Sequence, residues 1–189
     1  GNLEVLDYLL LKRANITLQN EYGSTALHLA AKAGKLEVVK SLLIRGADTK
    51  AKDNAGNTAL MYASLKGHGV VVEKLLAAGA QVEAKHNAGF TALMCAVAKG
   101  HAAVVEKLLA AGADIDTKDK NGNTALSFML AQFHPDIATV LLVPGEPQDG
   151  ASLLVKAAKS GNIEAVKCLL DLKVKIDAKD NTSRTPLHW

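Results

Sequence analysis

The sequence has 189 residues, of which 49% are apolar but only 4% are aromatic, so its core must be built mainly from Ala, Leu and Val. Such small side chains suit thin, closely spaced helices better than one large globular interior. The net charge of +3 is too weak by itself to indicate nucleic-acid binding. No apolar run approaches the roughly 18 residues that a membrane-spanning helix needs.

The predicted elements begin with a helix in residues 1–10, because GNLEVLDYLL aligns with GKLEVVKSLL at residues 34–43. Four Thr-Ala-Leu triplets then follow, each 33 residues after the one before, at Thr25, Thr58, Thr91 and Thr124. Each triplet predicts a short helix, as in residues 58–66, followed by a Gly-His or similar turn. A second helix follows the turn, as in residues 70–78.

An extended hairpin is expected between the second helix of one unit and the first helix of the next. Gly79 suits the left-handed end of a helix. The turn signals DNAG, HNAG and DKNG, which begin at Asp53, His86 and Asp119, then close the extended stretches. Neither predicted helix is long enough to be stable alone. The units must therefore bury their apolar faces on one another and stack into a solenoid.

The register breaks after Thr124. The next equivalent position is Ser152, only 28 residues later, and the deficit falls in LLVPGEPQDG at residues 141–150. Two prolines there remove backbone donors and restrict the chain, so we expect a shortened hairpin. The irregularity is either tolerated by the stack, or it is a bend that shapes a binding groove or a joint between two sub-stacks.

Several motifs in the same register together resemble the ankyrin repeat. TALHLAA at residues 25–31 and TPLHW at residues 185–189 are similar to the family's Thr-Pro-Leu-His signature, and GADIDTKDKNGNTAL at residues 112–126 is similar to its hairpin. The resemblance implies an all-α solenoid of stacked helix-turn-helix units with hairpin loops. One ankyrin-repeat domain is expected over residues 1–189, with a partial repeat at 1–19, repeats at 20–52, 53–85, 86–118, 119–146 (with the shortened hairpin) and 147–179, and a truncated repeat at 180–189.

Histidines recur at equivalent turn positions, namely His68, His101 and His134. Stacked helices lie about 8–10 Å apart, whereas zinc ligands lie about 2 Å from the ion. These side chains therefore cannot share a metal, and we expect each to stabilise its turn by a hydrogen bond.

The family resemblance implies a different role for His28 and His188, which fall in the signature motif. There the imidazole is expected to bridge backbone groups of adjacent units. Met61 and Met94 take this place in the middle units, which favours more apolar packing between those units.

The sequence offers no case for catalysis. Gly67-His68-Gly69 lacks the preceding strand and the Gly-Lys-Ser/Thr ending of a phosphate loop. Neither a Ser-His-Asp nor a Cys-His set stands out by spacing. Cys95 and Cys168 lie two units apart, too far for a disulfide, so we expect two packed thiols. We therefore expect no enzyme activity, no metal and no cofactor.

The resemblance implies that partners bind in a concave groove formed by the hairpin tips and the exposed side of the first helices. Lysines recur along both borders of this groove and would make it positive, although the net charge is small. Before the turns stand Lys52, Lys85, Lys118 and Lys179, and near the ends of the first helices stand Lys32, Lys66, Lys99 and Lys159. Tyr22 and Phe90 at the hairpin tips and Leu65 on a first helix suit the apolar anchors of a binding hot spot.

We therefore predict a protein–protein interaction scaffold that binds an acidic or mixed acidic-apolar segment of another protein. The competing interpretation of the lysines is an ordinary solvated face. The alternative function, motivated by ends that lack polar capping repeats, is a regulatory or targeting arm of a longer enzyme or microbial effector. The scarcity of arginine and of stacking aromatics argues against nucleic acid, and no membrane partner is expected.

Two cysteines without a dense framework favour a reducing compartment. The start of the sequence lacks the basic and then apolar form of a signal peptide. We therefore expect an intracellular, cytoplasmic location, or the host cytosol for an effector. The sequence does not define the oligomeric state.

Overall fold

The computed structural model describes residues 3–132 and, in the C-terminal third, residues 137, 154–155, 157–159, 161, 163–171, 174–177, 179 and 183–188. The regular elements of these residues are helices, and no strand occurs among them. The expected shortened hairpin at residues 141–150 and the turn histidine His134 lie outside the described residues.

The helices follow one another in pairs of seven and nine residues. The pairs are α2 (Ala26–Lys32) with α3 (Leu36–Ile44), α4 (Ala59–Leu65) with α5 (Gly69–Ala77), and α6 (Ala92–Ala98) with α7 (Ala102–Ala110). The remaining elements are α1 (Leu3–Leu11), α8 (Ala125–Gln132), α11 (Ile163–Asp171) and the 3-10 turn η1 (Pro186–His188). The bounds of α4 and α5 differ by one residue at each end from the helices predicted at 58–66 and 70–78.

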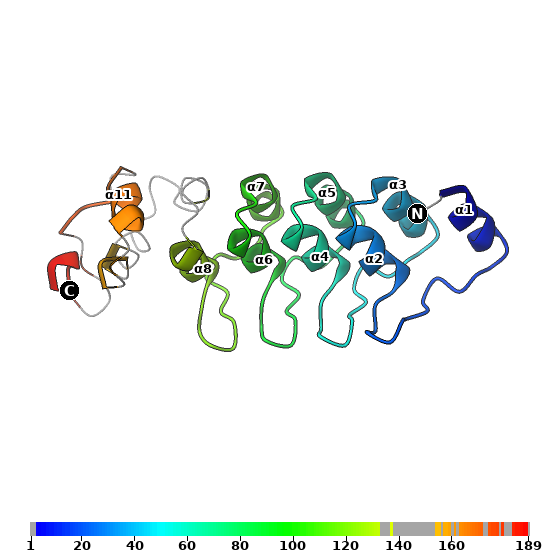
Figure 1. Ribbon diagram of the computed structural model, residues 1–189, viewed down its shortest axis with the longest axis horizontal. Coiled ribbons are helices and arrows are strands. Elements are labelled where there is room, and N and C mark those ends of the chain that lie inside the picture. The colour runs from blue at the N-terminus through cyan, green and yellow to red at the C-terminus, as the bar shows by residue number, and fades with distance from the viewer. Residues whose placement is uncertain are drawn as a thin grey trace.

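The pairs stack side by side into an elongated solenoid of two helix layers (Figure 1). The first helices α2, α4, α6 and α8 form one layer, and α3, α5 and α7 form the other. The hairpin loops project beyond the layer of first helices. The first helices pack on one another in order from α2 to α8, the second helices from α3 to α7, and α2, α4 and α6 also pack on their own partners. The predicted all-α solenoid of stacked two-helix units is thus confirmed.

Threonine hydroxyls cap two of the first helices. Thr58 and Thr91 lie in extended backbone just before α4 and α6. The hydroxyl of each accepts a hydrogen bond from the backbone amide three residues later, at 3.3 and 3.4 Å respectively. A threonine at this position satisfies an amide that has no partner within the helix. The recurring Thr-Ala-Leu triplet therefore marks helix starts for a local physical reason.

The core is a continuous layer of small and medium-sized aliphatic side chains between the two helix layers. Leu42, Leu75 and Leu108 occupy equivalent positions on the second helices, and each is 0% exposed. On the first helices, Ala31 and Ala63 are also fully buried, which lets neighbouring backbones approach closely. Burying one leucine contributes about 2 kcal/mol. Since helices this short are not stable alone, the units stabilise one another through this layer.

His28 connects the first two pairs and is almost fully buried. Its Nδ1 lies 3.1 Å from the amide nitrogen of Thr25, and its Nε2 lies 3.0 Å from the carbonyl oxygens of both Ala51 and Asn57. Because the amide must donate, Nδ1 accepts and the Nε2–H is shared by the two carbonyls of the next hairpin. The bridge between adjacent units that was expected for His28 is confirmed.

The residues at the position of His28 in other units also pack or hydrogen-bond locally. Met61 and Met94, at the positions equivalent to His28, are 2% and 1% exposed and pack in the core. His188 makes the same local contact as His28, with its Nδ1 3.1 Å from the amide nitrogen of Thr185.

A ladder of backbone hydrogen bonds ties each hairpin to the next. Three amides, of Asn54, Asn87 and Lys120, donate to carbonyls of the preceding hairpin, of Tyr22, Ala55 and Ala88, at 3.0, 2.9 and 3.0 Å. Gly56 in the DNAG turn has φ of +81°, and a Cβ there would lie 2.5 Å from the side-chain oxygen of Asn87. The glycine therefore serves both the positive φ of the turn and the close approach of the next hairpin.

Candidate functional site

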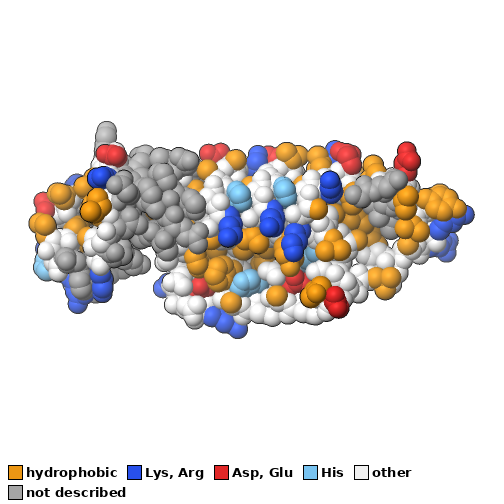
Figure 2. Space-filling model, in the orientation of Figure 1, with side chains coloured by type: hydrophobic (Ala, Val, Ile, Leu, Met, Phe, Trp, Pro, Cys, Tyr) orange, Lys and Arg blue, Asp and Glu red, His pale blue; other side chains and the backbone are white. Residues whose placement is uncertain are grey.

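One face of the solenoid combines a row of basic side chains with an apolar band (Figure 2). The row crosses the middle of the molecule over α2, α4 and α6, and the band lies between the row and the hairpins. Most acidic side chains visible in this view lie along the edge formed by the second helices. We call the surface between the hairpin tips and the C-terminal ends of α2, α4 and α6 the groove.

Three predicted lysines stand at the helix ends along the groove. Lys66 and Lys99 are the residues that directly follow α4 and α6, and both are exposed. Lys32 is the last residue of α2 and so lies one position earlier in the register, equivalent to Leu65. Its Nζ lies 5.2 Å from the centre of the Tyr62 ring, within range of a cation–π contact. Of these three lysines, only Lys66 and Lys99 therefore occupy the same position in their repeats.

Two of the four predicted lysines before the hairpin turns are engaged in the stack. The Nζ of Lys52 donates to the carbonyl of Lys85 at 2.8 Å, and the Nζ of Lys85 donates to the carbonyl of Lys118 at 3.0 Å. Lys118 and Lys179 are exposed. The ammonium groups of Lys52 and Lys85 hold one hairpin against the next, a structural role that the sequence did not reveal.

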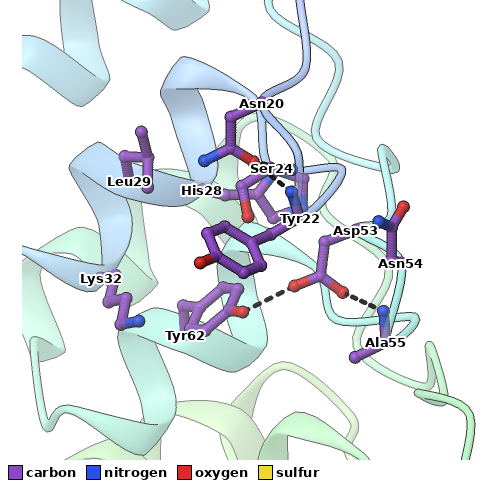
Figure 3. Close-up of a pocket in the computed structure, with 10 residues that line it drawn as sticks. All are labelled: Asn20, Tyr22, Ser24, His28, Leu29, Lys32, Asp53, Asn54, Ala55 and Tyr62. Carbon is purple, nitrogen blue, oxygen red and sulfur yellow. Dashed lines mark hydrogen bonds between the residues drawn. The ribbon is translucent and has the colours of Figure 1, made fainter.

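At its N-terminal end the groove deepens into a pocket of about 480 Å³ between two hairpins and the helices α2 and α4 (Figure 3). Tyr22 belongs to the first hairpin, Leu29 and Lys32 to α2, Asp53 to the second hairpin and Tyr62 to α4. Tyr22 is 66% exposed and Leu29 is 51% exposed. Figure 3 shows the Tyr22 ring reaching from its hairpin over the pocket. Large apolar surface is thus left in water at this end of the groove.

Asp53 and Tyr62 form the polar wall of the pocket. The Tyr62 hydroxyl donates to Oδ2 of Asp53 at 2.6 Å, and Oδ1 of Asp53 accepts the amides of Ala55 and Asn57 at 3.0 and 2.8 Å. Burial alone would raise the pKa of Asp53, but these hydrogen bonds, led by the one from Tyr62, hold it below the ordinary 3.8. Burial and the neighbouring carboxylate raise the pKa of Tyr62. Asp53 therefore fixes its turn and the tyrosine.

Two of the three predicted apolar anchors are less free than the sequence indicated. Phe90 is half-buried, with its ring centre 4.8 Å from the ring centres of both His86 and Phe128. Leu65 is also half-buried and packs against the core. Tyr22 alone among the three projects as an exposed ring. Partner binding by Phe90 and Leu65 stays a prediction, and the geometry assigns them to the packed floor of the groove.

Sequence reasoning missed two residues that line the pocket, Leu29 and Tyr62. A signal was available, because Leu29, Tyr62 and Phe128 stand in one 33-residue register and are large side chains on first helices, although the equivalent Cys95 is small and buried. Of these residues, Leu29 and Tyr62 line the pocket.

The turn histidines tie each unit to the one before. Nε2 of His68 lies 3.2 Å from the carbonyl oxygen of Lys32, and Nε2 of His101 lies 3.2 Å from that of Leu65. The predicted hydrogen bond at each turn is confirmed for these two residues, and it reaches the end of the preceding first helix. Within the described part of the chain, no group of three or more His, Cys, Asp or Glu is placed to hold a metal ion.

Cys95 is a free, buried thiol on α6, and burial raises its pKa to about 11. It is therefore a neutral packing group at ordinary pH rather than a nucleophile. The side chain of Cys168 lies outside the described part of the structure.

The comparisons with known proteins agree with this architecture. The family model described as ankyrin repeats in three copies matches residues 1–86, 71–146 and 128–189, so that the matches together span the chain. The chain belongs to the ankyrin repeat family. A search of curated proteins finds no match. Ankyrin repeats generally mediate protein–protein interaction. None of the helices in the described residues has the length and apolar character that crossing a bilayer requires.

Proposed function

We propose that this chain is a protein-interaction scaffold whose groove binds an acidic, or mixed acidic and apolar, segment of another protein. The observation that carries the proposal is the pair Lys66 and Lys99. Both are exposed, both occupy the same position in their units, and neither side chain has a hydrogen-bonding or acidic partner among the described residues.

The distribution of acidic side chains supports this choice of partner. On the second helices, Lys40 pairs with Glu37, and Lys107 pairs with Glu73. In the groove, the buried Asp53 and Asp119 accept hydrogen bonds within their own turns, which leaves them poor partners for the lysines. Lys66 and Lys99 in the groove thus have no acidic partner among the described residues, whereas Lys40 and Lys107 on the second helices do. Their positive field speeds the encounter with an acidic segment and disfavours basic ones.

The apolar part of the proposal rests on the pocket. Beside the basic row, Tyr22 exposes most of its surface and Leu29 exposes about half. Aromatic and aliphatic anchors surrounded by charge are typical of the few residues that carry most of the binding energy in an interface. A partner segment with one apolar residue among acidic ones would match both features.

The test is capture of a partner by the wild-type chain, followed by measurement of its affinity for two charge-reversal variants. Lys66→Glu with Lys99→Glu changes the groove, whereas Lys40→Glu with Lys74→Glu makes the same change in net charge on the second helices. We expect the groove variant to weaken binding at least tenfold at low salt and the control variant to change it less than threefold. Equal effects of the two variants would remove the groove from the account.

The alternative proposal is that the same groove belongs to a regulatory or targeting arm of a longer enzyme or microbial effector. The two proposals differ only in whether the polypeptide carries a further catalytic part. The sequence of the full open reading frame decides between them. In either form we place the protein in the cytoplasm, or in a host cytosol. The neutral, unpaired thiol of Cys95 suits a reducing compartment, and cell fractionation with an antibody tests that location.

A further inference from the structure

The groove has two chemically different parts that follow one another along the stack. The pocket at α2 and α4 offers Tyr22 and Leu29 as exposed apolar surface. The next two units offer Lys66 and Lys99 instead, at the ends of α4 and α6. A segment lying along the groove therefore meets an apolar site first and two ammonium groups afterwards.

Lys66 and Lys99 at the helix ends keep their ammonium groups available to a ligand, as does the exposed Lys118. Lys52 and Lys85 donate to carbonyls of the following hairpins, at 2.8 and 3.0 Å. Within the described residues, Lys66 and Lys99 make no such bond. Lys32 lies over the Tyr62 ring at the edge of the pocket and adds a third positive charge there.

The spacing of the units decides which conformation of a bound segment can use these groups. Stacked helices repeat every 8–10 Å or so. A β-strand advances roughly 3.3 Å per residue, and successive side chains point to opposite faces. Two side chains three residues apart would match the spacing of the units, but they would point to opposite faces of the strand. A polyproline II helix has about 3 residues per turn and rises about 3.1 Å per residue, so every third side chain faces the same way about 9 Å further on. Its pitch matches the stack.

We propose that the groove recognises a partner segment in the polyproline II conformation with one apolar residue and two carboxylates at intervals of three. The apolar residue occupies the pocket between Tyr22 and Leu29, and the carboxylates pair with Lys66 and Lys99. This inference rests on the proposed function and adds to it the conformation and the spacing of the partner. Exposed aromatic side chains in a groove are a general feature of polyproline II recognition.

The test compares peptides of equal composition by fluorescence anisotropy with the whole chain at low salt. The first peptide has the sequence Phe-Pro-Pro-Glu-Pro-Pro-Glu. The second has the same sequence reversed, because the peptide that binds shows in which direction the segment lies along the groove. The control is Phe-Pro-Glu-Pro-Glu-Pro-Pro, which keeps charge and proline content but loses the spacing. Two exposed ion pairs are expected to give one of the two spaced peptides about a fivefold advantage over the control.

Variants of the chain separate the two halves of the site. Lys66→Gln with Lys99→Gln should abolish the preference for the spaced peptide, and Tyr22→Ser should weaken the spaced and control peptides alike. Equal binding of all three peptides to the wild-type chain, or binding of none, would overturn the inference. In that case, a captured protein partner that still depends on Lys66 and Lys99 leaves the proposed function standing. A captured partner that ignores these lysines contradicts both.

Discussion

Replacing His28 tests how much the stack depends on one buried bridge between units. Methionine is the informative substitute, because Met61 and Met94 occupy the equivalent positions and are 2% and 1% exposed. The sulfur of Met61 lies 3.4 Å from the amide nitrogen of Thr58, so a methionine retains a weak acceptor for the start of its helix. What His28→Met removes is the Nε2–H that the carbonyls of the next hairpin share.

The size of the effect follows from those two carbonyls. The Asn57 oxygen also accepts the amide of Asp53 at 3.0 Å, so it keeps a partner, whereas the Ala51 oxygen loses its bond to His28. One net hydrogen bond plus partial desolvation of a carbonyl corresponds to about 1–2 kcal/mol. His28→Ala also leaves the Thr25 amide without an acceptor and creates a cavity, which raises the expected cost to about 3–4 kcal/mol.

The assay is equilibrium unfolding in urea followed by circular dichroism, with Leu29→Ala as the control on the same helix. Leu29 is 51% exposed, so its truncation should cost less than about 1 kcal/mol. The reasoning fails if His28→Met is as stable as the wild type, or if His28→Ala costs no more than Leu29→Ala.

Three further outcomes are expected. Gly56→Ala should destabilise the chain by about 2 kcal/mol more than Gly79→Ala. Both glycines have φ of +81°, but only at Gly56 would a Cβ meet other atoms. Equal losses of unfolding free energy in urea would contradict the close stacking of the hairpins. Ser64→Ala should raise stability by about 1 kcal/mol, since the buried Ser64 hydroxyl has no hydrogen-bond partner among the described residues, and a lower melting temperature would refute this. The folded-state pKa of Asp53 lies below 3.8, so its ionised form stabilises the fold above that pH and the benefit is lost as the pH falls through the folded-state value. The difference in unfolding free energy between wild type and Asp53→Asn should therefore shrink from pH 5 to pH 2.5, and a constant difference would speak against the hydrogen-bonded carboxylate.

The fold was predictable because the sequence repeats the local signals that fix each unit. Thr58 and Thr91 cap helices, and the turn glycines take the positive φ that their positions require. Leu42 and its equivalents are buried wherever the period places them. These features depend on neighbours within one unit or one unit away, so their spacing along the chain was sufficient.

The site was predictable only in part, because the direction of long side chains depends on contacts that spacing does not define. Lys52 and Lys66 both looked like free charges, yet the first donates to the next hairpin. Phe90 looked like an exposed anchor, but it packs on Phe128, which comes from the following unit. The pocket joins Tyr22 and Tyr62 from different units, and only their placement in space brings them together.

The most direct measurement of the central claim is hydrogen–deuterium exchange of the whole chain with and without its captured partner. We predict slower exchange in the partner-bound chain at the hairpin tips around residues 54–57 and 87–90 and at the ends of α4 and α6, near Lys66 and Lys99. The second helices α5 and α7 should be unchanged. Protection confined to α5 and α7, with the groove exchanging as in the free chain, would contradict the account.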